Sequence, residues 1–110
     1  MAKLTRTLNG DFDELLNTIT RGVLDASATA SLEETWDAKT PTSRCSVRVF
    51  ERYSYSGSNR VSMSLTLFQS GSEIRLCAIT SGGSQAMFWK FNTLGEEFFL
   101  DTLKDVLNEL

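Results

Sequence analysis

The chain has 110 residues, a net charge of -3 at pH 7 and 41% hydrophobic residues, which suit one folded domain with a modest core. The negative charge argues against nucleic acid or an anionic membrane as a partner, and no apolar run is long enough to span a bilayer. Without histidine, and with only Cys45 and Cys77 as thiols, zinc sites and most hydrolase chemistries lack a required residue. We therefore expect a cytoplasmic protein without metal or cofactor, because no signal-peptide core follows Met1 and reduced thiols fit the cytosol.

The first third of the chain predicts a strand, a helix and a second strand. Residues 3–9 are rich in β-favouring side chains and lead into a turn. A helix then opens at Asp11, with Glu14 at the capping-box position. Its apolar stripe has helical spacing and consists of Phe12, Leu15, Leu16, Ile19, Val23 and Leu24. Gly22 weakens the last turn, and the alternation of residues 28–33 predicts the second strand.

The segment from Arg44 to Thr80 alternates apolar and polar residues and contains two glycine turns, which predicts an antiparallel meander of three strands. Folding the chain at these turns places Val49 opposite Leu65 and Leu65 opposite Leu76. All three strands then agree on one apolar face, and a slip by one residue would reverse every side chain.

The segment Ser81-Gly82-Gly83-Ser84 is interpreted as a strand connection rather than a phosphate loop. A phosphate loop normally leads into a helix and carries a lysine directly after its glycines, whereas a strand pattern follows here, at Met87, Trp89 and Phe91. A second capping box, from Thr93 to Glu96, then opens the C-terminal helix. The apolar stripe of that helix consists of Phe99, Leu103, Val106, Leu107 and Leu110.

These elements predict a single α+β domain over residues 1–110. Its antiparallel sheet has five to six strands, and a helix in the N-terminal half and a long C-terminal helix pack on one face, in the order β-α-β-β-β-β-β-α. The segments 44–54, 59–62 and 78–86 resemble a small bacterial family of about this length, known as a domain of unknown function, and the similarity runs from residue 9 to 96. The element order also resembles a shortened helix-grip fold. Neither resemblance implies an activity.

The outer face of the sheet, away from the helices, is a candidate contact surface. In the predicted register it carries Arg48, Phe50, Thr66, Phe68, Arg75 and Ile79. The simpler interpretation of the arginines is a solvated face with polar cross-strand pairs. The aromatic and aliphatic side chains beside them are, however, typical of subunit interfaces.

A second candidate site is a ligand pocket between the sheet and the C-terminal helix, lined by Glu51, Tyr53, Ser84 and Gln85. Alternation places Glu51 on the inner face, where an unpaired carboxylate is costly. It therefore requires a partner, Arg6 or Tyr53, or a β-bulge at Phe50-Glu51 that turns it into water.

We accordingly predict a binding or interaction module that forms a homodimer through the outer sheet face. The alternative is a small-molecule binder that uses the pocket under the C-terminal helix, with an unknown ligand or protein partner. We predict no enzyme, because no complete set of catalytic residues can be assembled.

Overall fold

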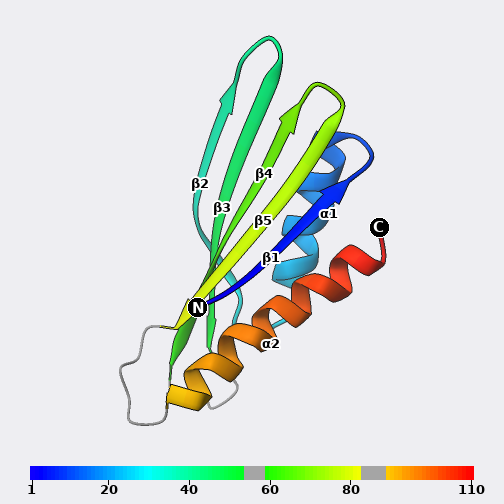
Figure 1. Cartoon of the computed structure of the whole chain (residues 1–110). Coiled ribbons are helices and arrows are strands. Elements are labelled where there is room, and N and C mark those ends of the chain that lie inside the picture. The colour runs from blue at the N-terminus through cyan, green and yellow to red at the C-terminus, as the bar shows by residue number, and fades with distance from the viewer. Residues whose placement is uncertain (54–58, 83–88) are drawn as a thin grey trace.

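The computed structural model describes residues 1–53, 59–82 and 89–110, with the backbone alone for residues 89–94. In chain order the elements are β1 (Ala2–Leu8), α1 (Phe12–Asp25), β2 (Ser31–Lys39), β3 (Ser43–Tyr53), β4 (Arg60–Ser70), β5 (Glu73–Gly82) and α2 (Trp89–Asn108). The strands form one antiparallel sheet in the order β1-β5-β4-β3-β2, so that the first strand lies beside the last (Figure 1). The predicted α+β class is confirmed.

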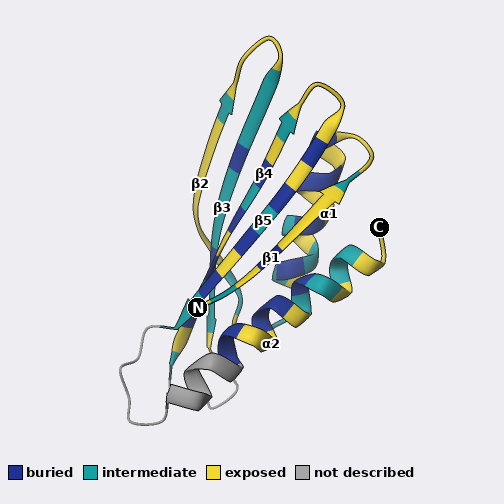
Figure 2. Cartoon of the chain, viewed as in Figure 1, coloured by how far each residue is buried: buried dark blue, intermediate teal, exposed yellow. Residues whose placement is uncertain are grey.

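The hydrophobic core lies between one face of this sheet and the two helices. Buried side chains alternate with exposed ones along β5 (Figure 2), as expected for a sheet with one covered face. The largest fully buried apolar side chains are Phe50, Phe99, Ile19, Met63, Leu65, Leu67, Ile74, Leu76 and Leu103. We call the face that carries Leu65 and Leu67 the inner face and its opposite, which carries Thr66 and Phe68, the outer face.

The first helix forms as predicted. Asp11 has an extended backbone, and its carboxylate accepts a hydrogen bond from the Glu14 backbone N–H at 3.0 Å, which satisfies one of the free donors of the first turn. Phe12, Ile19 and Val23 of the predicted stripe are buried against the sheet and α2.

Two of the predicted element boundaries are wrong. The second strand is β2, which covers Ser31–Lys39 rather than residues 28–33, and its pairing with β3 shifts between Leu32 and Glu34. The strand predicted at Met87, Trp89 and Phe91 is replaced by the start of α2, although Met87 itself lies outside the described residues. The order is therefore β-α-β-β-β-β-α, and the predicted capping box at Thr93 falls inside the helix.

The predicted pairing of β3 with β4 is wrong by one residue. Arg48, not Val49, lies opposite Leu65, and Phe50 lies opposite Met63. This slip reverses the faces of β3, so Phe50 is completely buried and Val49 points to the outer face. The physical reason is that β3 carries apolar side chains on both faces, and burying the large phenylalanine removes more apolar surface from water than burying a valine.

The pairing of β4 with β5 is displaced by two residues, which preserves the faces. Leu65 lies opposite Ala78 rather than Leu76, because the tight turn consists of Gly71 and Ser72 instead of Ser70 and Gly71. Gly71 has a φ of +60°, which favours glycine at the first central position of a two-residue hairpin turn.

Candidate functional site

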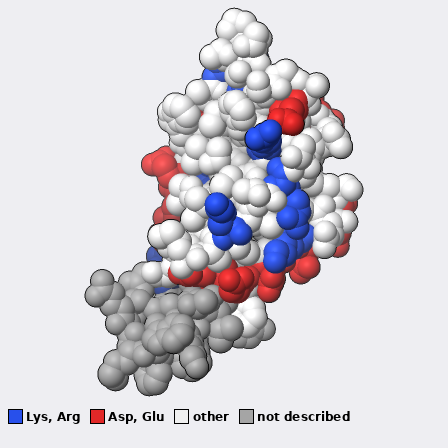
Figure 3. Space-filling view, in the orientation of Figure 1, with Lys and Arg blue, Asp and Glu red and all other residues white. Residues whose placement is uncertain are grey.

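The outer face of the sheet gathers apolar side chains that, within the described part of the chain, no helix covers. Trp36 on β2 is 59% exposed, Phe68 on β4 is 41% exposed and Ile79 on β5 is 39% exposed. The strand register places further apolar and sulfur-containing side chains between them, namely Cys45, Val47, Val49 and Cys77. Figure 3 shows a surface that is mainly uncharged, with separate groups of basic residues and a band of acidic residues below them.

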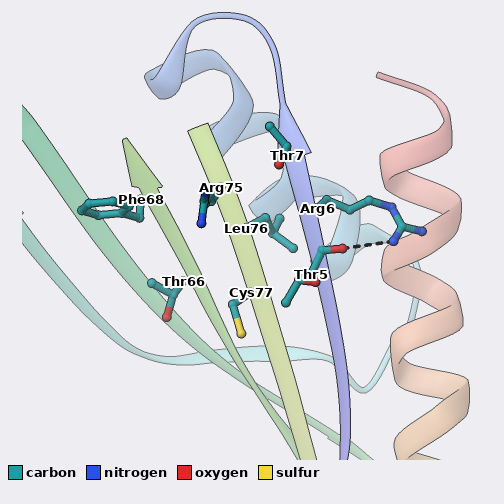
Figure 4. A pocket seen from close by; sticks show the side chains of 8 residues that line it. All are labelled: Thr5, Arg6, Thr7, Thr66, Phe68, Arg75, Leu76 and Cys77. Carbon is teal, nitrogen blue, oxygen red and sulfur yellow. Dashed lines mark hydrogen bonds between the residues drawn. The ribbon is translucent and has the colours of Figure 1, made fainter. Parts of the chain in front are cut away.

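A shallow depression of about 420 Å³ lies on this face, between β1, β5 and β4. Its lining residues are Thr5, Arg6, Thr7, Thr66, Phe68, Arg75, Leu76 and Cys77 (Figure 4). Arg6 points away from the others in Figure 4, and its Nη1 donates to the Thr5 carbonyl oxygen at 3.1 Å. The Arg75 Nε donates to Glu73 Oε1 at 2.8 Å. The depression thus combines hydroxyls and a thiol with an aromatic ring and a guanidinium group.

Four of the six predicted contact residues lie on the outer face: Thr66, Phe68, Arg75 and Ile79. The other two were placed on the wrong face, because the register of β3 was off by one. Phe50 belongs to the core, and Arg48 lies on the inner face, where its Nη1 donates to Asp37 Oδ1 at 3.0 Å. Trp36 was missed, since the segment around it showed no regular alternation.

Glu51 lies on the outer face, not under the C-terminal helix. Its partner is Arg60 rather than Arg6, with Arg60 Nη2 at 2.9 Å from Glu51 Oε1. The Arg60 guanidinium also lies over the ring of Tyr53, 5.6 Å from its centroid. Glu51 pairs with Ser62 without any irregularity between β3 and β4. The predicted bulge at Phe50-Glu51 is therefore wrong, and it is the register of β3 that turns this carboxylate outward.

The predicted ligand pocket is therefore not assembled as expected from the described residues. Tyr53 does line a depression of about 320 Å³ between the end of β3 and α2, together with Arg52 and Thr102, but Glu51 is not part of it. The predicted lining residues Ser84 and Gln85 lie outside the described residues. A small-molecule site next to α2 stays a prediction.

A charged cluster connects α1 with the hairpin of β2 and β3. Arg44 binds Asp13 through two hydrogen bonds, of 2.6 and 3.2 Å, and these lower the pKa of the Asp13 carboxyl. Asp37 accepts hydrogen bonds from Ser46 Oγ at 2.6 Å and from Arg48, which lower its pKa as well. Because both arginines already have carboxylate partners, the cluster favours a structural role over ligand binding.

A buried glutamate anchors α2 to the end of β5. Glu96 Oε2 accepts a hydrogen bond from the Gly82 backbone N–H at 2.6 Å, and its Oε1 lies 2.5 Å from the N-terminal ammonium of Met1. The backbone carbonyl of Glu96 accepts a hydrogen bond from the buried hydroxyl of Thr80 at 3.2 Å. The sequence suggested a capping role for Glu96, whereas the structure uses its carboxylate to hold two elements together.

Two classes of site are not found among the described residues. No group of three or more cysteine, aspartate, glutamate or histidine side chains is placed to hold a metal ion. No helix in the described ranges is long and apolar enough to cross a membrane.

The fold and its surfaces define a small α+β protein with two helices on one sheet face and exposed apolar side chains among polar ones on the opposite face. The chain belongs to the family of unknown function DUF6054, whose sequence model matches residues 1–110. The resemblance to an uncharacterised family of this length is therefore confirmed. No curated protein matches the chain.

Proposed function

We propose that this protein is an interaction module that associates with a second copy of itself through the outer sheet face. The observation that carries the proposal is the exposure of Trp36, Phe68 and Ile79 on a single face of the sheet. Burial of apolar surface contributes roughly 25 cal/mol per Å², and contiguous exposed apolar patches commonly mark contact sites. Arginine and aromatic side chains together are also enriched in interfaces.

The charges at the two edges of this face support a second copy as the partner. Glu34 on the edge strand β2 and Lys3 on the edge strand β1 belong to the same row of paired residues, with Ser64 of the central strand between them. We stack the outer faces of two copies and place a two-fold axis midway between them, parallel to the central strand. This axis brings each edge of one sheet over the opposite edge of the other. Each Glu34 then faces Lys3 of the second copy, which makes the surface self-complementary, as a two-fold interface requires.

The proposal includes a cytoplasmic location. Cys45 and Cys77 are free thiols, and the register places both on the outer face. In a reducing compartment these thiols stay unpaired, so the outer face remains available for association.

Sedimentation equilibrium over a concentration series tests the proposal. The wild-type chain should behave as a dimer, and Phe68→Asp should behave as a folded monomer because its carboxylate would be buried in the contact. Phe98→Asp is the matched control: Phe98 is 38% exposed, close to the 41% of Phe68, but lies on α2. It should remain dimeric. A wild-type chain that stays monomeric at high concentration, or equal effects of the two substitutions, would refute self-association through this face.

A further inference from the structure

We infer that Trp36 of each copy docks into the outer-face depression of the other copy. This inference rests on the proposed self-association and goes further, because it assigns the axis of the dimer and the side chain that fills the depression. It follows from the strand register, the position of the depression and the exposure of Trp36.

The strand register places Trp36 and the depression at opposite ends of one row. Read across the sheet from β2 to β1, this row consists of Trp36, Val47, Thr66, Cys77 and Thr5. Thr66 belongs to the central strand β4. A two-fold axis parallel to β4, between the two stacked sheets, therefore places each end of the row over the opposite end of the same row in the second copy. Trp36 then lies over Thr5 of the second copy, and Val47 lies over its Cys77. Thr5, Thr66 and Cys77 all line the depression.

The depression suits an indole ring in size and chemistry. Its volume of about 420 Å³ exceeds that of the ring, and Trp36 is 59% exposed and so available to fill it. Packed sheets lie about 10 Å apart, which a tryptophan side chain can bridge into a hollow of the facing sheet. The hydroxyls of Thr5 and Thr7 offer acceptors for the indole N–H, and the guanidinium of Arg75 can stack on the ring.

The neighbouring rows of paired residues favour this axis over a two-fold axis that lies between the sheets but runs perpendicular to the strands. The axis along β4 also places Glu34 over Lys3, and Val49 over Ile79 of the second copy. A two-fold axis across the strands would instead stack Trp36 on Trp36 and Thr5 on Thr5. That arrangement leaves both depressions empty and gives the edge charges no partners of opposite sign.

Mixing two monomeric variants tests the docking directly. Trp36→Ala removes the inserted side chain and keeps the depression. Thr5→Glu, at an exposed position, keeps Trp36 but places a carboxylate where the indole docks. Each homodimer loses both contacts, so each dissociation constant should rise by about 100-fold or more, as expected when a tryptophan that fills a pocket of the partner is lost. The mixed dimer retains one intact contact and should form at concentrations at which either variant alone is monomeric.

Leu32→Ala is the control for Trp36→Ala, because Leu32 is an exposed apolar residue of the same strand that pairs with Phe50 of the inner face. It should leave the dissociation constant within about threefold of the wild-type value, and circular dichroism should show that all variants fold. In a Trp89→Phe background, the fluorescence of Trp36 should shift to shorter wavelength as the protein dimerises.

The outcomes separate this inference from the proposed function. If the wild type dimerises and Phe68→Asp is monomeric, but Trp36→Ala dimerises normally, the docking is wrong and association through the outer face stands. If the two variants are monomeric and their mixture does not associate, the assigned axis is wrong. If the wild type is monomeric throughout, the proposed function and this inference fail together.

Discussion

Replacing Gly22 by alanine tests how closely α1 packs against α2. A Cβ atom at position 22 would lie 2.7 Å from Cγ1 and 2.9 Å from Cγ2 of Val106. Real Cβ atoms essentially never approach other heavy atoms so closely. Val106 is β-branched and has one strongly preferred side-chain conformation in a helix, so it cannot easily turn away. The two helices would have to separate instead.

The two opposing effects of this substitution can be weighed. Overpacking a well-packed contact typically costs about 1–3 kcal/mol, whereas alanine is favoured over glycine inside a helix by about 1 kcal/mol. We therefore expect Gly22→Ala to lower the free energy of unfolding by about 1 kcal/mol in the wild-type background. For a domain of this size, that corresponds to a fall in melting temperature of about 4 °C.

Val106→Ala should reverse the sign of this effect. With the valine methyl groups removed, the contact that remains of these is the Cβ of residue 106, 3.3 Å from the added Cβ at position 22. A shift of a few tenths of an ångström relieves this contact, so the helix-propensity gain remains. Gly22→Ala should then stabilise the Val106→Ala protein by about 1 kcal/mol, which gives a coupling of about 2 kcal/mol in a double-mutant cycle. Urea unfolding of the four proteins measures all the terms. Stabilisation by Gly22→Ala in the wild type, or a coupling near zero, would show that the helices have room at this crossing.

Two further substitutions test polar contacts. Hydrogen bonds from Ser46 and Arg48 hold the pKa of Asp37 below its ordinary value, so this carboxylate contributes stability above about pH 4 that is lost as the pH falls through the lowered pKa. Asp37→Asn should lower the urea midpoint at pH 7 and reduce its fall in acid; an unchanged acid dependence would contradict this. Thr80→Val removes the donor to the Glu96 carbonyl oxygen and should lower the free energy of unfolding by about 1 kcal/mol. A melting temperature at or above that of the wild type would show that this hydroxyl does not hold α2 to β5.

The sequence predicted the elements whose local signals are unambiguous. The Asp11 cap precedes a stripe with a single helical period, and both appear in α1. β4 and β5 carry apolar residues on one face only, so their faces were predicted correctly even though their pairing was displaced. Gly22 was interpreted as a weak point of the helix, whereas its role, to admit Val106, depends on a helix more than 80 residues away along the chain.

The wrong predictions occurred where a pattern fits two structures. The alternation of Trp89 and Phe91 covers too few residues to distinguish a strand from the first turn of a helix. The edge strand β2 has no buried residue, so it shows no regular alternation, and Trp36 within it gave no signal of its own. Glu96 matched a capping motif by spacing, but the helix begins earlier and leaves its carboxylate to bind Gly82.

The strand β3, whose register was predicted wrongly, also supports the proposed function. β3 presents Phe50 to the core, with Arg48 beside it on the inner face, and Val47 and Val49 to the outer face, so its apolar side chains are divided between the two faces. A solvated sheet face normally carries polar side chains, whereas the outer face of β3 carries Cys45, Val47 and Val49 in succession. The two helices cover only the inner side. An outer layer supplied by the sheet of a second copy would cover this apolar run of β3, with Val47 and Val49 facing Cys77 and Ile79 across the two-fold axis.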